Sequence, residues 1–314
     1  MNERKRVADK ARSSEENRQR TYLLSAQTVG AKALAPGLYL VATPIGNLAD
    51  MTLRGLETLA AADLIACEDT RVTRRLLDHY GITRPLRPYH DHNAATARPK
   101  ILGRLAEGAA IALVADAGTP LISDPGYKLV REAQAAGHRV TAIPGASAVL
   151  AAVATSGLPT DRFFFEGFLP AKPIARRARI AQLAAVPATL VLFESGPRLV
   201  EALADLAAGL GAREAAICRE LTKMHEEVRR GELATLAAAY AQGAELRGEI
   251  VIVVAPPEQA VSTVEDVDTL LRQALRAGSL KDAVRAVAEA TGRARRDVYQ
   301  RALVLAKSCN PPED

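Results

Sequence analysis

The chain has 314 residues, which is enough for two ordinary domains and an appendage. Its hydrophobic content of 48% and charged content of 25% are typical of a globular protein with a sizeable core. Residues 1–36 hold eight Lys/Arg and four Asp/Glu, so most of the formal net charge of +5 lies there. The rest of the chain is nearly neutral, and the basic balance by itself does not indicate nucleic-acid binding.

The cysteines and the hydropathy of the chain argue against a metalloprotein, a disulfide-stabilised protein and a membrane protein. The three cysteines, Cys67, Cys218 and Cys309, have no metal-ligand spacing and form no even set. The first twenty residues lack the apolar core of a signal peptide. The apolar stretch 140–159 is interrupted by prolines and glycines, so it predicts a buried helix rather than a membrane span. We therefore expect a cytoplasmic protein without a metal site.

The first part of the chain changes character at Gly37. Residues 1–36 are expected to be a disordered basic tail, after which strands and helices alternate. The expected strands are Gly37–Thr43, Asp63–Glu68, Ala109–Ala115 and Arg139–Ile143. The expected helices are Asp50–Ala61, Thr70–His79, Ala94–Glu107 and Pro125–Ala136. This alternation predicts an α/β domain over residues 37–158, with a largely parallel sheet covered on both faces.

The same alternation restarts after the break at residues 157–159. It predicts a second α/β domain over residues 159–257, again with mainly parallel strands. The expected strands are Arg162–Phe165, Thr189–Phe193, Ala215–Arg219 and Glu249–Val254. The expected helices are Lys172–Ala185, Arg198–Ala208 and Leu233–Gln242.

A helical module is expected at the C-terminal end, over residues 262–310. Apolar residues recur at helical spacing from Leu280 to Ala288, and Thr291-Gly292 makes a turn. The next apolar face is formed by Val298, Tyr299, Ala302 and Leu303. Two helices joined through a glycine turn predict a helix-turn-helix.

Three loops of small residues follow expected strands, at Thr43–Leu48, Asp116–Gly126 and Pro144–Ala148. Because parallel strands end at one edge of a sheet, these loops are expected to form one ligand groove. Glycines there allow close approach of the backbone, and prolines limit the ordering entropy. The phosphate-binding motifs G-x-x-x-x-G-K-[ST] and G-x-G-x-x-G are absent from their expected places. A groove without charged walls is thus predicted, suited to a neutral or cationic small molecule.

Seven segments together resemble one protein family. They are Leu40–Leu48, Cys67–Arg71, His90–Asn93, Asp116–Gly126, Ile143–Ser147, Phe164–Pro170 and Cys218–Glu226. Their order and spacing are similar to the 16S ribosomal RNA (cytidine-2′-O)-methyltransferases, a branch of the tetrapyrrole-methylase-like (class III) S-adenosylmethionine enzymes. The resemblance covers Gly37 to Lys307. It implies a homodimer of two-domain chains that binds S-adenosylmethionine between the domains. The implied reaction methylates the ribose of a decoding-site cytidine in the small ribosomal subunit.

The resemblance also assigns cofactor contacts, motif by motif. In the first domain they fall on Ile45, Ala117, Gly118, Thr119, Ile122, Ser147 and Ala148, and in the second on Glu194, Leu221, Glu249 and Ile250. Tetrapyrrole methylases usually carry Gly-Asp-Pro where this chain has Gly118-Thr119-Pro120, which favours the RNA branch over a porphyrinoid substrate. A tetrapyrrole methyltransferase and a non-catalytic, RNA-binding ribosome-assembly factor are the alternatives.

Methyl transfer to a ribose hydroxyl requires that the hydroxyl be positioned and its proton accepted. The candidate catalytic residues are Glu68, Asp69, His90, Asp91 and His92. Asp69 is equally expected as the N-cap of the helix that follows it. His92 or His90, oriented by Asp91, is the preferred hypothesis for the base, and metal binding by the two histidines is less favoured.

Two groups of arginines are candidate RNA contacts. Arg71 and Arg75 lie one helical turn apart, and Arg293, Arg295 and Arg296 surround the C-terminal turn. Each group is equally compatible with a solvated surface and with phosphate contacts. Aromatic residues make up only 4% of the chain, so we expect RNA to be held by shape and phosphates rather than by base stacking.

Overall fold

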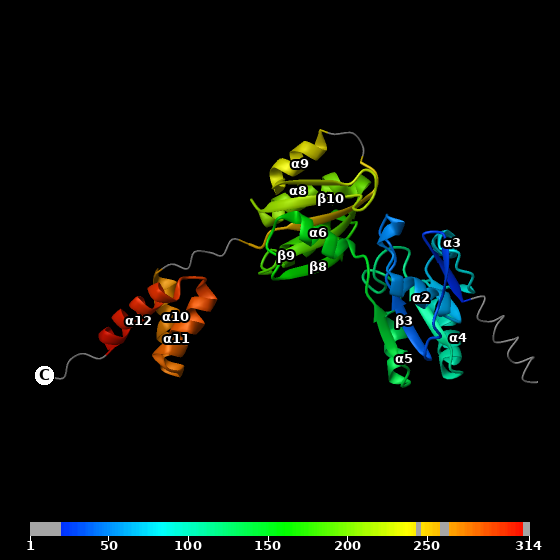
Figure 1. Ribbon diagram of the computed structural model, residues 1–314. Helices are drawn as coiled ribbons and strands as arrows, with labels where there is room; N and C mark the ends of the chain where they lie inside the picture. Colours follow the sequence, from blue (N-terminus) through cyan, green and yellow to red (C-terminus); the bar gives the residue numbers. More distant parts are fainter. Residues whose placement is uncertain (1–19, 243–245, 258–263, 310–314) are drawn as a thin grey trace, which may run out of the picture. The chain divides into compact units, whose positions relative to one another are not determined.

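The computed structural model describes residues 20–242, 246–257 and 264–309. The chain divides into two compact units, Met1–Pro256 and Pro257–Asp314. In its described residues the first unit contains two five-stranded sheets and a two-stranded hairpin, whereas the second is helical (Figure 1).

The first sheet is fully parallel, with the strand order β5-β4-β6-β3-β7. Its strands are β3 (Gly37–Val41), β4 (Leu64–Cys67), β5 (Leu86–Pro88), β6 (Ala110–Val114) and β7 (Val140–Ile143). The helices between them are η1 (Leu48–Asp50), α2 (Leu53–Ala61), α3 (Thr70–His79), α4 (Ala94–Ala106) and α5 (Tyr127–Ala135). Strands β4 and β6 are buried along their whole length, as central strands of a parallel sheet are.

Apolar side chains cover both faces of this sheet. One core group includes Leu59 of α2 and Leu77 of α3, and the other includes Leu105 of α4 and Leu129 of α5. The prediction of a parallel sheet between two helical layers is therefore confirmed for this part of the chain. Strand β5 was not predicted, because its three residues include an arginine and a proline and show no apolar pattern.

The second sheet has the order β11-β10-β12-β9-β8, and only the pair β8–β9 is parallel. Its strands are β8 (Phe163–Phe168), β9 (Thr189–Ser195), β10 (Glu214–Arg219), β11 (Glu227–Glu232) and β12 (Glu249–Val254). The helices are α6 (Ala148–Ser156), α7 (Pro173–Leu183), η2 (Gly196–Arg198), α8 (Leu199–Leu210) and α9 (Leu233–Ala241).

The prediction of mainly parallel strands is wrong for this second sheet. Strand β11 is polar and half-exposed, so it was not predicted, and it forms an antiparallel hairpin with β10. Strand β12 then pairs antiparallel with both β10 and β9. Strand and helix periodicities reveal where strands lie but not the direction in which they pair, and the short loop between β10 and β11 permits only an antiparallel turn.

Helix α6 packs on the second sheet, although it precedes the sequence break at Gly157. Its Val149 and Val153 share a core group with Val191 of β9 and Val251 of β12. The boundary between the two α/β parts therefore lies before α6 and not at residue 158. The opposite face of the sheet is covered by α7, α8 and α9.

Residues 20–36 are ordered, which corrects the prediction of a disordered tail over residues 1–36. They form a hairpin of β1 (Thr21–Leu24) and β2 (Gln27–Gly30). Tyr22 is 7% exposed and joins the core of the first sheet, and Arg20 pairs with Asp63 (3.0 Å). Residues 1–19 lie outside the described part of the chain. The hairpin was not predicted, because its alternation of apolar and polar residues is short and follows a strongly charged segment.

The described residues of the second unit form three helices, α10 (Val264–Ala277), α11 (Leu280–Thr291) and α12 (Arg295–Cys309). Their own core contains Leu271, Val287 and Val298. Helix α11 begins after Ser279, whose side chain accepts a hydrogen bond from the backbone N–H of Asp282, and ends at Gly292, with φ of 67°. The predicted turn is thus confirmed, but Tyr299 is 44% exposed and does not belong to the apolar face.

Among the described helices, none is long and apolar enough to cross a membrane.

Candidate functional site

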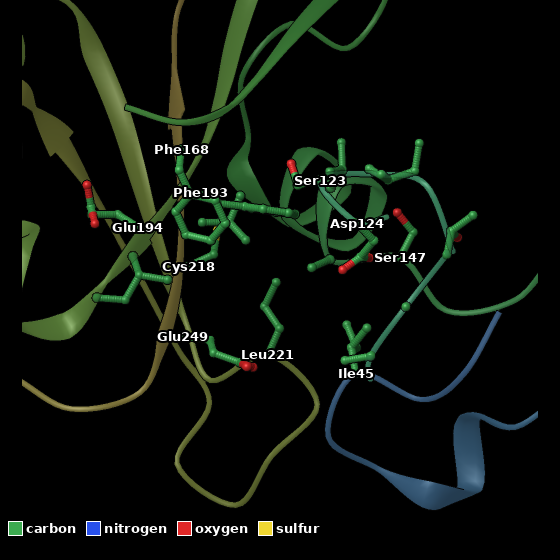
Figure 2. A pocket seen from close by; sticks show the side chains of 18 of the residues that line it. Ile45, Ser123, Asp124, Ser147, Phe168, Phe193, Glu194, Cys218, Leu221 and Glu249 are labelled. Carbon is green, nitrogen blue, oxygen red and sulfur yellow. The ribbon is translucent and has the colours of Figure 1, made fainter. Parts of the chain in front are cut away.

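A cavity of about 340 Å³ lies in the first unit, between the loops after β3, β6 and β7 and the ends of β9, β10 and β12. Figure 2 shows Ile45, Asp124 and Ser147 on one side, and Phe193, Leu221 and Glu249 on the other. All eleven residues predicted as cofactor contacts line this cavity, namely Ile45, Ala117, Gly118, Thr119, Ile122, Ser147, Ala148, Glu194, Leu221, Glu249 and Ile250. Their role in binding is a proposal, taken up below.

Backbone contacts hold the three loops of the first sheet together. Thr43 and Gly118 exchange two backbone hydrogen bonds, of 2.9 and 3.0 Å. The hydroxyl of Thr119 donates to the carbonyl of Ala146 (3.4 Å), which connects the second loop to the third. Gly118 has a φ of +75°, and a Cβ there would lie 3.3 Å from Ile45 Cγ2. The backbone therefore forms this wall of the cavity directly, as a ligand that approaches main-chain groups requires.

The cavity is negatively charged, contrary to the prediction of uncharged walls. Its lining, all within the described part of the chain, includes four acidic residues and contains neither lysine nor arginine. The acids are Asp116, Asp124, Glu194 and Glu249. The remaining walls are largely apolar and include Phe168, Phe193 and Val149. This composition fits a cation with an apolar body and disfavours a polyphosphate.

Two of these acids pair with cations, and the lysine that pairs with Glu249 also pairs with Glu220. Glu194 is 2% exposed, accepts a hydrogen bond from the backbone N–H of Ser195 (2.8 Å) and pairs with Arg198 (3.3 Å). In Figure 2 its carboxylate points away from the other labelled residues. Glu249 pairs with Lys223 (3.0 Å). Asp116 and Asp124 are the other two acids of the lining.

Asp124 belongs to a group of three acids at the ends of β4 and β6. It shares a hydrogen bond with Glu68, and Asp116 accepts one from the backbone N–H of Asp69 (2.9 Å). Burial, followed by the charges of Glu68 and Asp116, raises the pKa of Asp124 to about 7. Burial and the charge of Asp116 likewise raise the pKa of Glu68. Glu68 and Asp124 thus form a carboxyl–carboxylate pair that holds a proton near neutral pH.

Comparison with known proteins identifies the family. The model of tetrapyrrole (corrin/porphyrin) methylases matches residues 37–237, and that of the RsmI C-terminal HTH domain matches residues 261–306. Ribosomal RNA small subunit methyltransferase I of Mesorhizobium japonicum is 53% identical over 278 residues, which are 88% of this chain and 95% of that protein. The protein of the same name from Pseudomonas aeruginosa is 45% identical over 271 residues, 85% of this chain and 96% of the relative. The chain belongs to the ribosomal RNA small subunit methyltransferase I family, within the tetrapyrrole methylases.

Solved structures add information on the fold alone. The methyltransferase CobJ superposes with a TM-score of 0.53 at 20% identity, over 70% of this chain and 94% of that one. Diphthine synthase superposes with a TM-score of 0.55 at 18% identity, over 69% of this chain and 89% of that one. The predicted family and fold class, two α/β parts followed by a helical module, are therefore confirmed.

The five candidate catalytic residues are not among the residues that line the cavity. Asp69 caps α3 by accepting a hydrogen bond from the backbone N–H of Arg71 (2.7 Å) and also binds the Arg71 side chain, which lowers the pKa of Asp69 to about 2. It is therefore a cap and a very weak base. Glu68 belongs to the acidic pair described above.

The two histidines occupy the loop before α4. His92 is exposed, whereas the Nδ1 atom of His90 is buried and has no hydrogen-bond partner among the described residues. The two rings are 6.0 Å apart. Asp91 is also exposed, and its charge contributes to the raised pKa of Glu68. Catalysis by either histidine stays a prediction.

The predicted RNA contacts divide between the two units. Arg71 and Arg75 are exposed on α3, and Arg71 is held by Asp69. Arg295 and Arg296 are exposed at the start of α12, and Arg295 pairs with Glu289 (3.5 Å). Arg293 is half-buried before that helix. Their contact with RNA stays a prediction.

Sequence reasoning missed Asp124 and the aromatic wall of the cavity. Asp124 stands in the loop that was recognised as a ligand loop, but its raised pKa depends on burial in the fold and then on Glu68, which is distant in the sequence. Phe168 is 55% exposed and contacts Phe193, with ring centroids 5.5 Å apart. It follows a shift in the β8–β9 register between Phe165 and Gly167, which sequence patterns of strand residues do not reveal. Within the described residues, no group of three or more His, Cys, Asp or Glu side chains is arranged to hold a metal ion.

Proposed function

We propose that this chain transfers the methyl group of S-adenosylmethionine to the ribose 2′-hydroxyl of a decoding-site cytidine in 16S ribosomal RNA. The substrate class is supported by relatives named ribosomal RNA small subunit methyltransferase I, of which the chain covers 95% and 96% of the length. The observation that carries the proposal is the single cavity that collects all eleven residues predicted to contact the cofactor.

The cavity fits S-adenosylmethionine in charge and in shape. The sulfonium and ammonium groups of this molecule are cationic, and the acidic lining, which includes Asp116 in the loop after β6, supplies matching negative charge. The apolar walls at Ile45, Leu221 and Ile250 suit its adenosine part. When bound, S-adenosylmethionine supplies an electrophilic methyl group.

The residues of the chain must then orient the ribose hydroxyl, exclude water and accept a proton. The loops after β3, β6 and β7 are joined by hydrogen bonds, so the site is largely formed before a ligand binds. RNA would meet the arginines of α3 and of the C-terminal helices through its phosphates. The proposal includes a homodimer in the cytoplasm, and both of these features rest on the family resemblance.

The test uses small ribosomal subunits from a strain that lacks the enzyme, together with S-adenosylmethionine labelled in its methyl group. Label is expected in one nucleotide of 16S rRNA, on the ribose of a cytidine, as located by nuclease digestion and mass spectrometry. Label on the base, or transfer only to a porphyrinoid offered in parallel, would contradict the proposal. Binding of subunits without any transfer would instead support the non-catalytic assembly factor.

A further inference from the structure

Asp124 differs from the other acids that line the cavity in the group with which it shares a hydrogen bond. Asp116 accepts a backbone hydrogen bond, Glu194 is held by Arg198, and Glu249 is held by Lys223. Asp124 instead shares its hydrogen bond with another carboxyl group, that of Glu68, which is not a lining residue.

The loop before Asp124 is held in a costly backbone conformation. Leu121 and Ser123 have φ values of 73° and 62°, a region that side chains other than glycine rarely adopt. Ser123 also lies against the second sheet, since a Cβ on Gly167 would be 3.0 Å from its Oγ. Strain of this kind persists where the surrounding structure fixes a functional group. Here it directs Asp124 to the cavity (Figure 2).

We propose that Asp124 is the group that accepts the proton of the attacking ribose hydroxyl, and that Glu68 is a positioning residue that sets the proton affinity of Asp124. The inference deepens the proposed methyl transfer and rests on it. Besides burial, the charges of Glu68 and Asp116 act on Asp124, and those of Asp116, Asp91 and His90 act on Glu68.

The step balances with the groups already named. Ionised Asp124 takes the proton as the O2′–H bond breaks, and the electron pair left on O2′ forms the O2′–CH3 bond. The bonding pair of the broken S–CH3 bond stays on sulfur, which yields S-adenosylhomocysteine. Asp124 then returns the proton to water. A base with a pKa near 7 is ionised in about half of the molecules at neutral pH, and it is a far stronger base than an ordinary aspartate.

The experiment compares Asp124→Asn and Glu68→Gln in the full chain, because both changes preserve side-chain shape. Single-turnover methylation of small subunits is measured between about pH 5.5 and 9. Binding of S-adenosylmethionine and of S-adenosylhomocysteine is measured by calorimetry, and carbon-13 NMR follows the aspartate carboxyl groups. Asp161→Asn, at an exposed loop position, controls for the loss of an acid.

For the wild type we expect a rate that rises with pH and levels off above about 7, with one aspartate titrating there in the NMR spectrum. Asp124→Asn should lose that signal and lower the rate by about 10²- to 10⁴-fold, while both binding constants change less than about threefold. Glu68→Gln should shift the pH profile to lower pH, because it removes a negative neighbour, and a purely structural role would not do this. Asp161→Asn should match the wild type.

Three results would overturn the inference. One is an Asp124→Asn rate within about threefold of the wild type, most clearly if His92→Ala loses activity instead. Another is loss of S-adenosylmethionine binding in Asp124→Asn, which would make this carboxylate a cofactor ligand. The third is an unchanged pH profile in Glu68→Gln. Failure of the proposed function has a different signature, because the wild type would then place no label on ribose.

Discussion

At the residue scale, Gly118 shows how one main-chain position shapes the cavity wall. Its φ of +75° disfavours any side chain, and a Cβ would also press on Ile45. Gly137 has nearly the same φ, +79°, but a Cβ there would meet nothing within 4 Å. Replacing either glycine by alanine should therefore cost about 1 kcal/mol or more in backbone conformational energy. The two replacements differ in what the new methyl group contacts.

We therefore expect Gly118→Ala to weaken S-adenosylmethionine binding by about tenfold, a free-energy change of about 1.4 kcal/mol. Gly137→Ala should lose similar stability and keep the wild-type binding constant. Calorimetric titration and thermal unfolding of both variants give the two quantities. Equal loss of binding in the two variants would show that Gly118 acts only through general stability.

A second residue-scale prediction concerns the pH dependence of stability. The pKa of Asp124 is raised from 3.8 to about 7 in the folded chain, so between these values the folded state binds more protons than the unfolded state. The contribution of this group to stability is therefore lost as pH rises towards 7. Asp124→Asn should melt above the wild type at pH 8 and close to it at pH 4. A variant that melts below the wild type at pH 8 would contradict the assigned pKa direction.

At the element scale, the chain shows which patterns predict structure and which do not. Long runs such as Ala109–Ala115 predicted β6 well, because burial on both faces requires a continuous apolar segment. The edge strands β5 and β11 face solvent on part of their surface and carry no such pattern. Pairing direction in the second sheet depends on contacts between distant segments, so periodicity could not reveal it.

The candidate site residues likewise include some whose position was predictable from the sequence and one whose properties were not. The eleven cavity residues were predictable because family motifs fix their order along the chain and strand ends gather them at one edge. The raised pKa of Asp124 was not predictable, since it comes from burial in the fold and from the charge of Glu68, which is distant in the sequence.

The N-terminal hairpin gives a prediction at this scale. Tyr22 is buried in the core of the first sheet, whereas Leu24, two residues further on, is 38% exposed. Tyr22→Ala should lower the free energy of unfolding by about 3 kcal/mol, because a large buried ring leaves a cavity, and Leu24→Ala by less than about 1 kcal/mol. Urea unfolding of the full chain measures both. Equal, small effects would mean that the hairpin contributes little to the fold.

At the scale of the whole molecule, the cavity and the C-terminal arginines belong to different compact units. The first unit contains the cavity, and the described residues that line it all precede Pro256. The second unit has its own core and exposes basic side chains around its turn. If the second unit binds RNA through these side chains, substitutions there should lower RNA binding and leave the cavity unchanged.

Substitution of Arg295 and Arg296 tests whether the second unit contributes to RNA binding. Both are exposed at the start of α12, away from the core residues Val298 and Ala302, so Arg295→Ala with Arg296→Ala should leave the fold intact. If they neutralise phosphates, the double variant should weaken binding to small subunits. The slope of log affinity against log salt should fall by up to about two, one for each contact.

Binding of S-adenosylmethionine should not change in that variant, because the cavity contains none of these residues. The matched control is Arg162→Ala with Arg139→Ala, two exposed arginines of the first unit that lie outside the cavity lining. An unchanged salt slope for the α12 variant would make its arginines a solvated helix face. Loss of affinity with an unchanged slope would mean that they contact RNA without releasing counterions, which direct phosphate contacts do not allow.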